Sequence, residues 1–486
     1  MNHWLILPIL FPAFVAATQI LAHRHLTVQR GLALATGTLT LIMLVWMFVR
    51  ARDLGIETYH PGHFLSPAGS VLVLDRLAIT FLLLTNVLGL FALASLSAIG
   101  LDRQQRHLHP LAQFLLMGLN GSFLAGDLFT LFLFMEAAVI AATGLMLQSG
   151  SRGQPAARRF LRSHLWALAL FSVAIGGLYS LTGTLTLADL AEKATALHGP
   201  DQALLSATSL LLFGGMAQIS GLFPFHPWLR TSLTSAPAPI ALLIAALPLA
   251  GAYAILRLFT QILPDPPLLP WLLAAALATG IAGLIGGLRS TSLAQLAVEA
   301  LLVGNAGVFA TMAVATEPGA AAALILLVPA SLGSAALILL VGALQGGNPV
   351  LTLPSRPFVL LLLLAGLSVA GAPPFAGFLA HLMALKAAFH TQPLLLVPFL
   401  LVAPALCLLA FLRHLLPLSD PLHTGLPQPA TAGLRPPILP VALAAALLIL
   451  SLSLLPFAFP VLKFLRGTAY HLYMKTEYIN AVLGLP

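Results

Sequence analysis

Long apolar segments alternate with short polar ones along the whole chain. About fourteen windows are apolar over the roughly 20 residues that a helix needs to cross the hydrocarbon core of a membrane. The windows begin near Leu5, Gly31, Leu77, Leu111, Leu128, Leu165, Ala203, Ile240, Leu269, Leu293, Ala320, Phe358, Pro393 and Pro440. This pattern predicts an all-α polytopic membrane protein with about 14 transmembrane helices.

The connections between the windows are short and show no boundary between domains. A turn of Asn and Gly residues separates the fourth and fifth windows, and Asp127 is placed to cap the helix that follows. The two long Pro-rich connectors, Leu263–Pro270 and Leu416–Pro440, have similar apolar sequence on both sides. We therefore expect a single membrane domain over residues 1–486.

Composition supports the same class. Of the 486 residues, 59% are hydrophobic and only 7% are charged, whereas soluble domains carry about 25% charged residues. A soluble chain of this length could not cover its surface with so few charges. Composition also excludes a disordered chain, a disulfide scaffold and a nucleic-acid binder. The single cysteine, Cys407, lies in an apolar run and is expected to be a small buried hydrophobe.

The positions of the arginines predict the orientation in the membrane. The first apolar run has no Lys or Arg before it, which is wrong for a secretory signal peptide and favours an N-terminus outside the cell. With fourteen spans, both termini then lie outside. The predicted cytoplasmic segments hold 13 of the 22 Lys and Arg residues, including the cluster Arg152–Arg162 and, after the seventh span, Arg230.

Three titratable residues lie inside predicted spans. They are Glu136, Glu299 and His381. A charge at the bilayer centre costs about 2.5–3.5 kcal/mol on insertion scales, so a residue of this kind in a span usually has a function. The alternative is that each side chain is neutral and hydrogen-bonds a neighbouring helix.

Two predicted spans contain helix breakers. Residues 214–229 include Pro224 among several glycines, and residues 367–381 include the adjacent Pro373 and Pro374. Spans interrupted by Gly and Pro in corresponding parts of two halves indicate an inverted-repeat transporter, in which the freed carbonyls line a hydrated path. The alternative is a pair of ordinary proline kinks.

The sequence contains no motif for chemistry on an organic substrate. It has no CxxC, HExxH or paired His that would indicate a metal or haem, and no nucleotide-binding motif. We therefore expect no cofactor, no metal and no enzymatic activity. Moving a proton or a small cation requires only titratable groups, polar helix breaks and water.

Several segments resemble a known family. DLFTLFLFMEAAVIAATGLM, FPFHPWL, SAPAPIALLIAALPLAGAYAILRL and GAPPFAGF resemble the antiporter-like subunits of respiratory complex I. The opening MNHWLILPILFPA, the segments VLVLDRL and FLLMGLNGSFLAGDLF, and the ending YINAVLG resemble, more narrowly, the D-type subunits of multisubunit Mrp/Pha-type cation/proton antiporters.

The resemblance implies a fold and a setting. It implies two inverted five-helix repeats, each with one discontinuous helix: N-terminal helices at 1–110, repeats at 111–260 and 268–413, and a C-terminal helix and tail at 437–486. It implies the inner (plasma) membrane of a bacterium, termini that are periplasmic or extracellular, and other hydrophobic antiporter subunits as partners. Protons and Na⁺ or K⁺ are the implied ions.

The resemblance also implies roles for residues. Glu136 matches the fifth-helix Glu of the family, and His381 stands where related sequences have a twelfth-helix Lys. The family's seventh- and eighth-helix Lys positions fall on Ile219 and Leu249 here, and neither residue carries protons. Glu299 matches no family carboxylate and is either a substitute relay group or a packing choice.

Three functions compete on this basis. The first is an antiporter subunit that moves protons through hydrated half-channels, with Glu136, Glu299 and His381 as relay sites and Gln218 and His226 holding water at the first break. The second is a non-conducting assembly subunit of the same complex. The third is a proton-pumping membrane subunit of a complex I-like oxidoreductase or hydrogenase.

Overall fold

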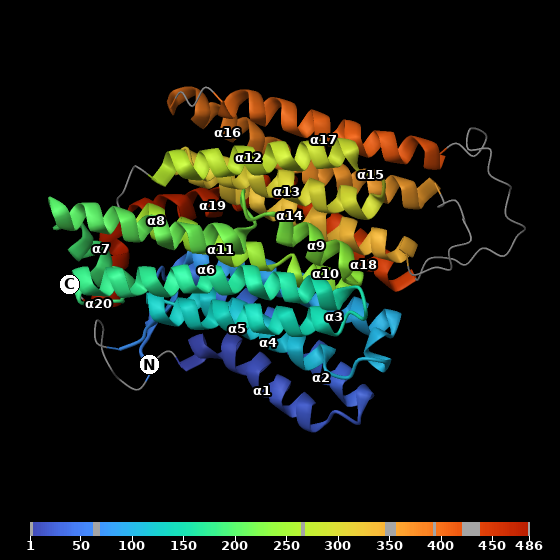
Figure 1. Cartoon of the computed structure of the whole chain (residues 1–486), viewed down its shortest axis with the longest axis horizontal. Coiled ribbons are helices and arrows are strands. Elements are labelled where there is room, and N and C mark those ends of the chain that lie inside the picture. The colour runs from blue at the N-terminus through green and yellow to red at the C-terminus, as the bar shows by residue number, and fades with distance from the viewer. Residues whose placement is uncertain are drawn as a thin grey trace, which may run out of the picture.

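The computed structural model describes residues 3–61, 69–263, 268–345, 356–391, 395–419 and 438–484. Most of them form helices that lie side by side in one bundle (Figure 1). The helices before residue 264 are α1 (Leu7–Leu21), α2 (Leu26–Asp53), α3 (Arg76–Ile99), α4 (Leu108–Leu124), α5 (Leu128–Leu147), α6 (Gly153–Thr182), α7 (Leu187–Thr195), α8 (Pro200–Ser220), α9 (Pro227–Ser235), α10 (Ala238–Ile244) and α11 (Leu247–Leu256), followed by the π-helical turn η4 (Arg257–Ile262). The later helices are α12 (Leu268–Arg289), α13 (Leu293–Met312), α14 (Glu317–Gln345), α15 (Arg356–Ala370), α16 (Gly377–Thr391), α17 (Leu396–Ser419), α18 (Ile438–Ser453), α19 (Ala458–Tyr473) and α20 (Lys475–Leu483).

The all-α membrane fold predicted from the sequence is confirmed. By length and composition, 11 helices among the described residues are long and apolar enough to cross a membrane, or 12 if the bent pair α18–α19 is one span. The predicted fourth and twelfth spans correspond to α4, of 17 residues, and α15, of 15 residues. Both are shorter than the roughly 20 residues of a full crossing, so length alone does not give the predicted count of about 14.

Side-chain caps fix where three of the long helices begin. Asp75 accepts a hydrogen bond from the Ala78 backbone N–H at the start of α3, and Asp127 accepts one from Thr130 at the start of α5. Ser292 does the same for α13. Each cap satisfies one of the backbone donors that the first turn of a helix leaves free. The predicted cap at Asp127 is confirmed.

Burial separates central helices from outer ones. The segment from α10 to η4 and the helix α14 are buried on nearly all sides, whereas α1, α2, α6 and α12 are buried on one side only. Large apolar side chains point outward from the outer helices, among them Phe14, Trp166 and Ile449, which are 73%, 75% and 67% exposed. An apolar exterior of this kind suits a lipid environment or a hydrophobic partner.

A small sheet closes one end of the bundle. The strand β1 (Glu57–Tyr59) pairs antiparallel with β2 (Leu72–Leu74), with Glu57 opposite Leu74. Isolated bridges join Leu72 to Ala125 and Asp127 to Thr186. These pairings hold the connections before α3, α5 and α7 together.

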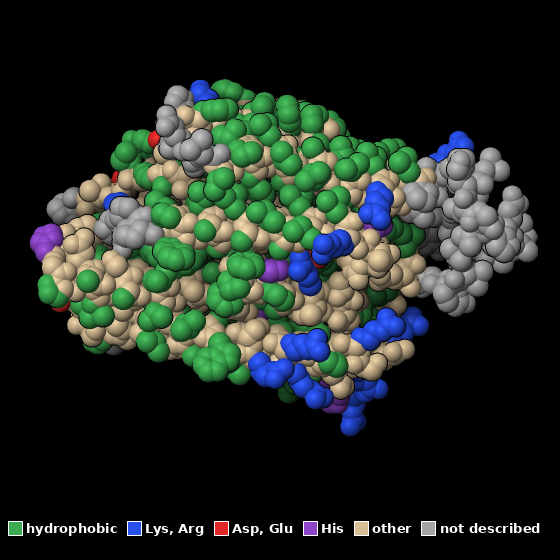
Figure 2. Space-filling model, turned by 45° about the horizontal axis from the view of Figure 1, so that its top comes forward, with side chains coloured by type: hydrophobic (Ala, Val, Ile, Leu, Met, Phe, Trp, Pro, Cys, Tyr) green, Lys and Arg blue, Asp and Glu red, His purple; other side chains and the backbone are tan. Residues whose placement is uncertain are grey.

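The two ends of the bundle differ in charge. The first and last described residues lie at the same end (Figure 1). Lys and Arg side chains gather toward the opposite end (Figure 2). The exposed arginines in the connections before α2, α4 and α6 and in the first turns of α6 are Arg24, Arg103, Arg106, Arg152, Arg158, Arg159 and Arg162.

Candidate functional site

The first helix break lies between α8 and α9. Gly221 adopts a left-handed conformation with φ +68°, which allows the chain to leave the helix. Its N–H bonds the Gln218 carbonyl at 3.1 Å, and the Leu222 N–H bonds the Ala217 carbonyl at 2.9 Å. This is a Schellman closure of the helix end. A cis peptide bond to Pro224 follows before the helix resumes.

The second break, between α15 and α16, repeats the first 150 positions later. Gly371 has φ +64° and its N–H bonds the Ser368 carbonyl at 3.2 Å. The Ala372 N–H bonds the Leu367 carbonyl at 2.9 Å, and a cis bond joins Pro373 to Pro374. Both predicted interruptions are therefore true breaks with the same backbone arrangement, and they are not proline kinks in continuous helices.

The predicted prolines and His381 occupy different parts of these breaks. Pro224, Pro373 and Pro374 are exposed on the surface of the chain. His381 lies inside the second break, where its Nδ1 is 2.9 Å from the Gly377 carbonyl oxygen. Its ring fills the space beside Gly371, because a Cβ at that glycine would collide with the ring.

Buried polar atoms gather around the first break. The Gln218 carbonyl accepts a hydrogen bond of 2.7 Å from Trp228 Nε1. Several buried side-chain atoms here have no hydrogen-bond partner among the described residues: His164 Nε2, Gln218 Nε2, Ser220 Oγ, His226 Nδ1 and Ser232 Oγ. A buried polar atom without a partner costs about 1–3 kcal/mol, so the break is a place where water lowers the free energy.

An ion pair connects this break to the second half of the chain. Arg230 on α9 faces both carboxylate oxygens of Glu299 on α13, with Nε 2.6 Å from Oε1 and Nη2 2.7 Å from Oε2. Arg230 Nη2 also donates to the Ala282 carbonyl at 2.9 Å, and Nη1 lies 3.2 Å from His226 Nε2. The predicted residues Glu299 and His226 are thus brought together by an arginine.

Glycines on α12 make room for this ion pair. A Cβ at Gly286 would collide with the Glu299 carboxyl carbon, so the carboxylate packs directly on the helix backbone. A cavity of about 10 Å³ beside Glu299 is also lined by Gly287 and Cys407. Cys407 is buried, as predicted.

Glu136 stands apart from this cluster. It is half-buried on α5, and its carboxylate has no hydrogen bond or ion pair with the part of the chain that the structure describes. The family Lys positions are apolar and buried, with Ile219 2% and Leu249 4% exposed. No interaction in the described residues connects Glu136 or His381 to Glu299.

Arg230 is the charged residue of this cluster that the sequence analysis did not propose as a site residue, because it counted this arginine only in a connection predicted to be cytoplasmic. The structure places it in α9, because the helix resumes at Pro227 directly after the break. The local sequence does place Arg230 beside a residue that was predicted to belong to the site. Arg230 follows His226 by four residues, a spacing that puts two side chains on one face of a helix.

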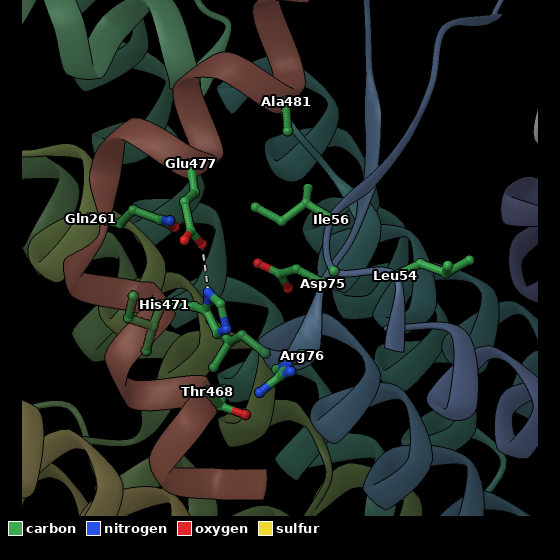
Figure 3. A pocket seen from close by; sticks show the side chains of 12 residues that line it. Leu54, Ile56, Asp75, Arg76, Gln261, Thr468, His471, Glu477 and Ala481 are labelled. Carbon is green, nitrogen blue, oxygen red and sulfur yellow. Dashed lines mark hydrogen bonds and ion pairs between the residues drawn. The ribbon is translucent and has the colours of Figure 1, made fainter. Parts of the chain in front are cut away.

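A separate pocket opens beside α20 (Figure 3). It has a volume of about 230 Å³. His471 and Glu477 form an ion pair of 2.6 Å at its wall. Asp75 and Gln261 line it from other elements. Asp75 and Gln261 each accept a hydrogen bond from the buried Arg257. The pocket contains none of the residues predicted from the sequence.

No group of three or more His, Cys, Asp or Glu side chains within the described ranges is arranged to hold a metal ion. The side chains at the two helix breaks and in the Arg230–Glu299 pair can exchange protons and hold water.

A family model described as NADH:quinone oxidoreductase/Mrp antiporter, TM matches residues 125–406, which is more than half of the chain. The chain belongs to the NADH:quinone oxidoreductase/Mrp antiporter family. The matched range includes both helix breaks and the Arg230–Glu299 pair. It also includes Glu136 and His381.

Relatives in this family share much of the chain. The D subunit of a probable K⁺/H⁺ antiporter of Rhizobium meliloti is 33% identical over 72% of this chain and 67% of its own length. The D subunit of a Na⁺/H⁺ antiporter of Alkalihalophilus pseudofirmus is 30% identical over 81% of this chain and 82% of its own length.

Solved structures share the fold. A chain of the Mrp complex from Dietzia sp. DQ12-45-1b superposes with a TM-score of 0.89 over all of both chains, at 22% identity. A chain of respiratory complex I from Thermus thermophilus gives a TM-score of 0.77 at 21% identity, covering 96% of this chain and 99% of that chain. At these identities the likeness shows the fold alone.

Proposed function

We propose that this chain is a membrane subunit of a multisubunit monovalent cation/proton antiporter, and that it takes part in proton translocation through hydrated half-channels. Two relatives that are 30% or more identical over most of their length are named as the D subunits of K⁺/H⁺ and Na⁺/H⁺ antiporters. The family match over residues 125–406 supports the same assignment.

The observation that carries this proposal is the pair of matched helix breaks. In both, the helix before the break ends at a left-handed glycine with the same hydrogen bonds. Broken helices at corresponding positions of two halves are the usual site of ion passage in transporters. We assign the two halves to inverted repeats over 111–260 and 268–413.

Roles follow from where each side chain lies. His381 sits in the second break and Glu299 beside the first, so both are placed to exchange protons with water in a break. Gln218 and His226 have buried nitrogens without a partner in the described part of the chain, and these can hold such water. Glu136 on α5 has no partner among the described residues and is assigned as a proton relay site of the first half.

The setting follows from the charge distribution. We assign the arginine-rich end of the bundle (Figure 2) to the cytoplasm by the positive-inside rule, and both termini then lie in the periplasm or extracellular space. The membrane is the inner membrane of a bacterium. The partners are other hydrophobic antiporter subunits, and the ions are protons and Na⁺ or K⁺.

A second candidate function is a non-conducting assembly subunit. It is favoured by the apolar residues Ile219 and Leu249, which stand where the family resemblance predicts lysines, so Glu136 lacks the partner that the resemblance implies. A third is the membrane subunit of a complex I-like oxidoreductase, which the shared fold favours. Flavin, iron–sulfur or nickel subunits that co-purify in mild detergent would support the third.

The deciding experiment is reconstitution of the complex into liposomes that contain a pH-sensitive dye. Na⁺ or K⁺ is added outside, and the proton flux is measured for the wild type and for Glu136→Gln and His381→Ala. Glu192→Gln, at an exposed position of α7, is the control. We expect reduced flux in the first two variants and no change in the control. Unchanged flux in both would favour the assembly subunit.

A further inference from the structure

Arg230 and Glu299 form an ion pair between the two halves of the chain. Arg230 belongs to the resumed helix of the first break, and Glu299 to α13 of the second half. The same break is tied to α12 by a hydrogen bond of 2.7 Å from the Phe223 N–H to Thr279 Oγ1. The first break is therefore anchored on the second half by its backbone and by a charge pair.

The hydrogen bonds determine the proton positions around Arg230. A guanidinium only donates, so His226 Nε2 accepts from Arg230 Nη1. A neutral His226 then carries its proton on Nδ1, which is buried and unpartnered among the described residues. A second positive charge on His226 would lie 3.2 Å from the guanidinium, which disfavours it.

Few other groups can set the charge of Glu299. On the α9 side, the Glu299 carboxylate faces Arg230, and His226 lies on the other side of the guanidinium. From α12 it faces glycine backbone at Gly286. From α17 it faces Cys407 across the small cavity. The basic residues of α17 are engaged elsewhere, since Arg413 donates to the Leu288 carbonyl and His414 contacts Ser290.

Glu299 Oε2 accepts a hydrogen bond from Arg230 Nη2, and Oε1 lies 2.6 Å from Arg230 Nε. The positive charge beside both oxygens favours the ionised carboxylate, so Glu299 binds a proton more readily when the guanidinium is farther away. Arg230 has two other partners, the Ala282 carbonyl and His226, which stabilise its charge independently of Glu299. A turn of the Arg230 side chain away from Glu299 would leave the carboxylate free to bind a proton.

We propose that Arg230 and Glu299 form a proton-exchange switch, in which Glu299 takes up a proton from water when Arg230 turns away and returns it to water when Arg230 comes back. Arg230 stays protonated throughout and is a positioning residue. The inference rests on the proposed function for its role in transport. The exchange itself depends only on the pair.

The first measurement is proton flux through the reconstituted complex as a function of pH. Glu299→Gln is expected to abolish cation-driven flux. Arg230→Gln removes the positive charge, so Glu299 binds its proton more tightly and releases it only at higher pH. The flux profile should move up by about one to three pH units. Arg230→Lys should restore most of the shift, and Arg289→Gln, at an exposed position of α12, should change nothing.

The second measurement detects the proton on Glu299 without transport. Infrared difference spectra of the purified complex near neutral pH should show no protonated carboxyl band from Glu299 in the wild type. Arg230→Gln should produce such a band, and the double variant Arg230→Gln/Glu299→Gln should lack it. The double variant removes both charges, so it leaves no buried unpaired charge and should fold.

The outcomes separate the two proposals. A wild-type complex without cation-driven flux overturns the proposed function, while the infrared band still decides the switch. Wild-type flux and an unchanged pH profile in Arg230→Gln and Glu299→Gln overturn the switch. So does a spectrum of Arg230→Gln that lacks the carboxyl band.

Discussion

Arg257 donates two hydrogen bonds to the carboxylate of Asp75, 182 positions earlier in the chain, at 2.6 and 2.9 Å. Asp75 is the cap of α3 and Arg257 begins the π-helical turn η4. The guanidinium is 1% exposed and also contacts the Tyr253 hydroxyl and Gln261. One buried ion pair thus joins the start of α3 to the end of the most deeply buried span.

Removing the charge of Asp75 should destabilise the protein strongly. Asp75→Asn keeps a cap for α3 but leaves the buried guanidinium without a counter-charge, which costs about 3–5 kcal/mol. We expect a clear fall in the apparent melting temperature of the purified complex at a fixed scan rate. Asp53→Asn, at the exposed Arg52–Asp53 pair, is the control and should have no measurable effect. Equal melting temperatures for the two variants would show that the buried pair does not support the fold.

A second buried carboxylate should give a pH-dependent stability. Asp102, between α3 and α4, is fully buried and binds Arg30 at 2.7 Å and His109 at 2.8 Å. Burial raises the pKa of Asp102, but the hydrogen bonds from Arg30 and His109 outweigh burial and hold the pKa at about 2. Because this is below the roughly 3.9 of an unfolded Asp, the contribution to stability is complete above about pH 4 and is lost as the pH falls toward 2.

The test compares the wild type with Asp102→Asn. The difference in apparent melting temperature should be constant between about pH 5 and 7 and should shrink below about pH 4. Taking the difference removes the effect of other carboxylates that titrate in the same range. Asp201→Asn, at an exposed position, should show no difference from the wild type at any pH. A gap for Asp102→Asn that stays constant down to pH 3 contradicts the prediction.

The glycine of the second break should not tolerate a side chain. Gly371 combines φ +64° with a neighbouring His381 ring that a Cβ would strike. Gly183 has φ +67°, but a Cβ added there would have no atom within 4 Å. Gly183→Ala therefore measures the backbone strain alone, without a collision. Gly183→Ala should cost about 1 kcal/mol. Gly371→Ala should lower the melting temperature further and reduce proton flux, because His381 must move. Equal effects of the two variants would mean that the ring adapts without cost.

Local patterns explain how much of the fold the sequence predicts. The spans, the cap at Asp127 and the two breaks each depend on a run of neighbouring residues, so apolar windows and Gly and Pro positions predict them. The ion pairs depend on residues far apart. Glu299 lies 69 positions from Arg230, and Asp75 lies 182 from Arg257. Nothing in either local sequence indicates the partner, so the sequence identified Glu299 as unusual without explaining it.

The Arg230–Glu299 contact should also depend on one glycine of α12. A Cβ at Gly286 would strike the Glu299 carboxyl group, whereas a Cβ at the adjacent Gly287 would meet only ordinary contacts, the nearest at 3.7 Å. Alanine favours helices over glycine by about 1 kcal/mol, so Gly287→Ala should be neutral or slightly stabilising. Gly286→Ala should displace the carboxylate from Arg230 and reduce proton flux toward the level of Glu299→Gln. The two variants differ by one position on the same helix, and only the alanine at position 286 collides with the carboxyl group. Wild-type flux in Gly286→Ala would therefore show that the carboxylate does not need its place against α12.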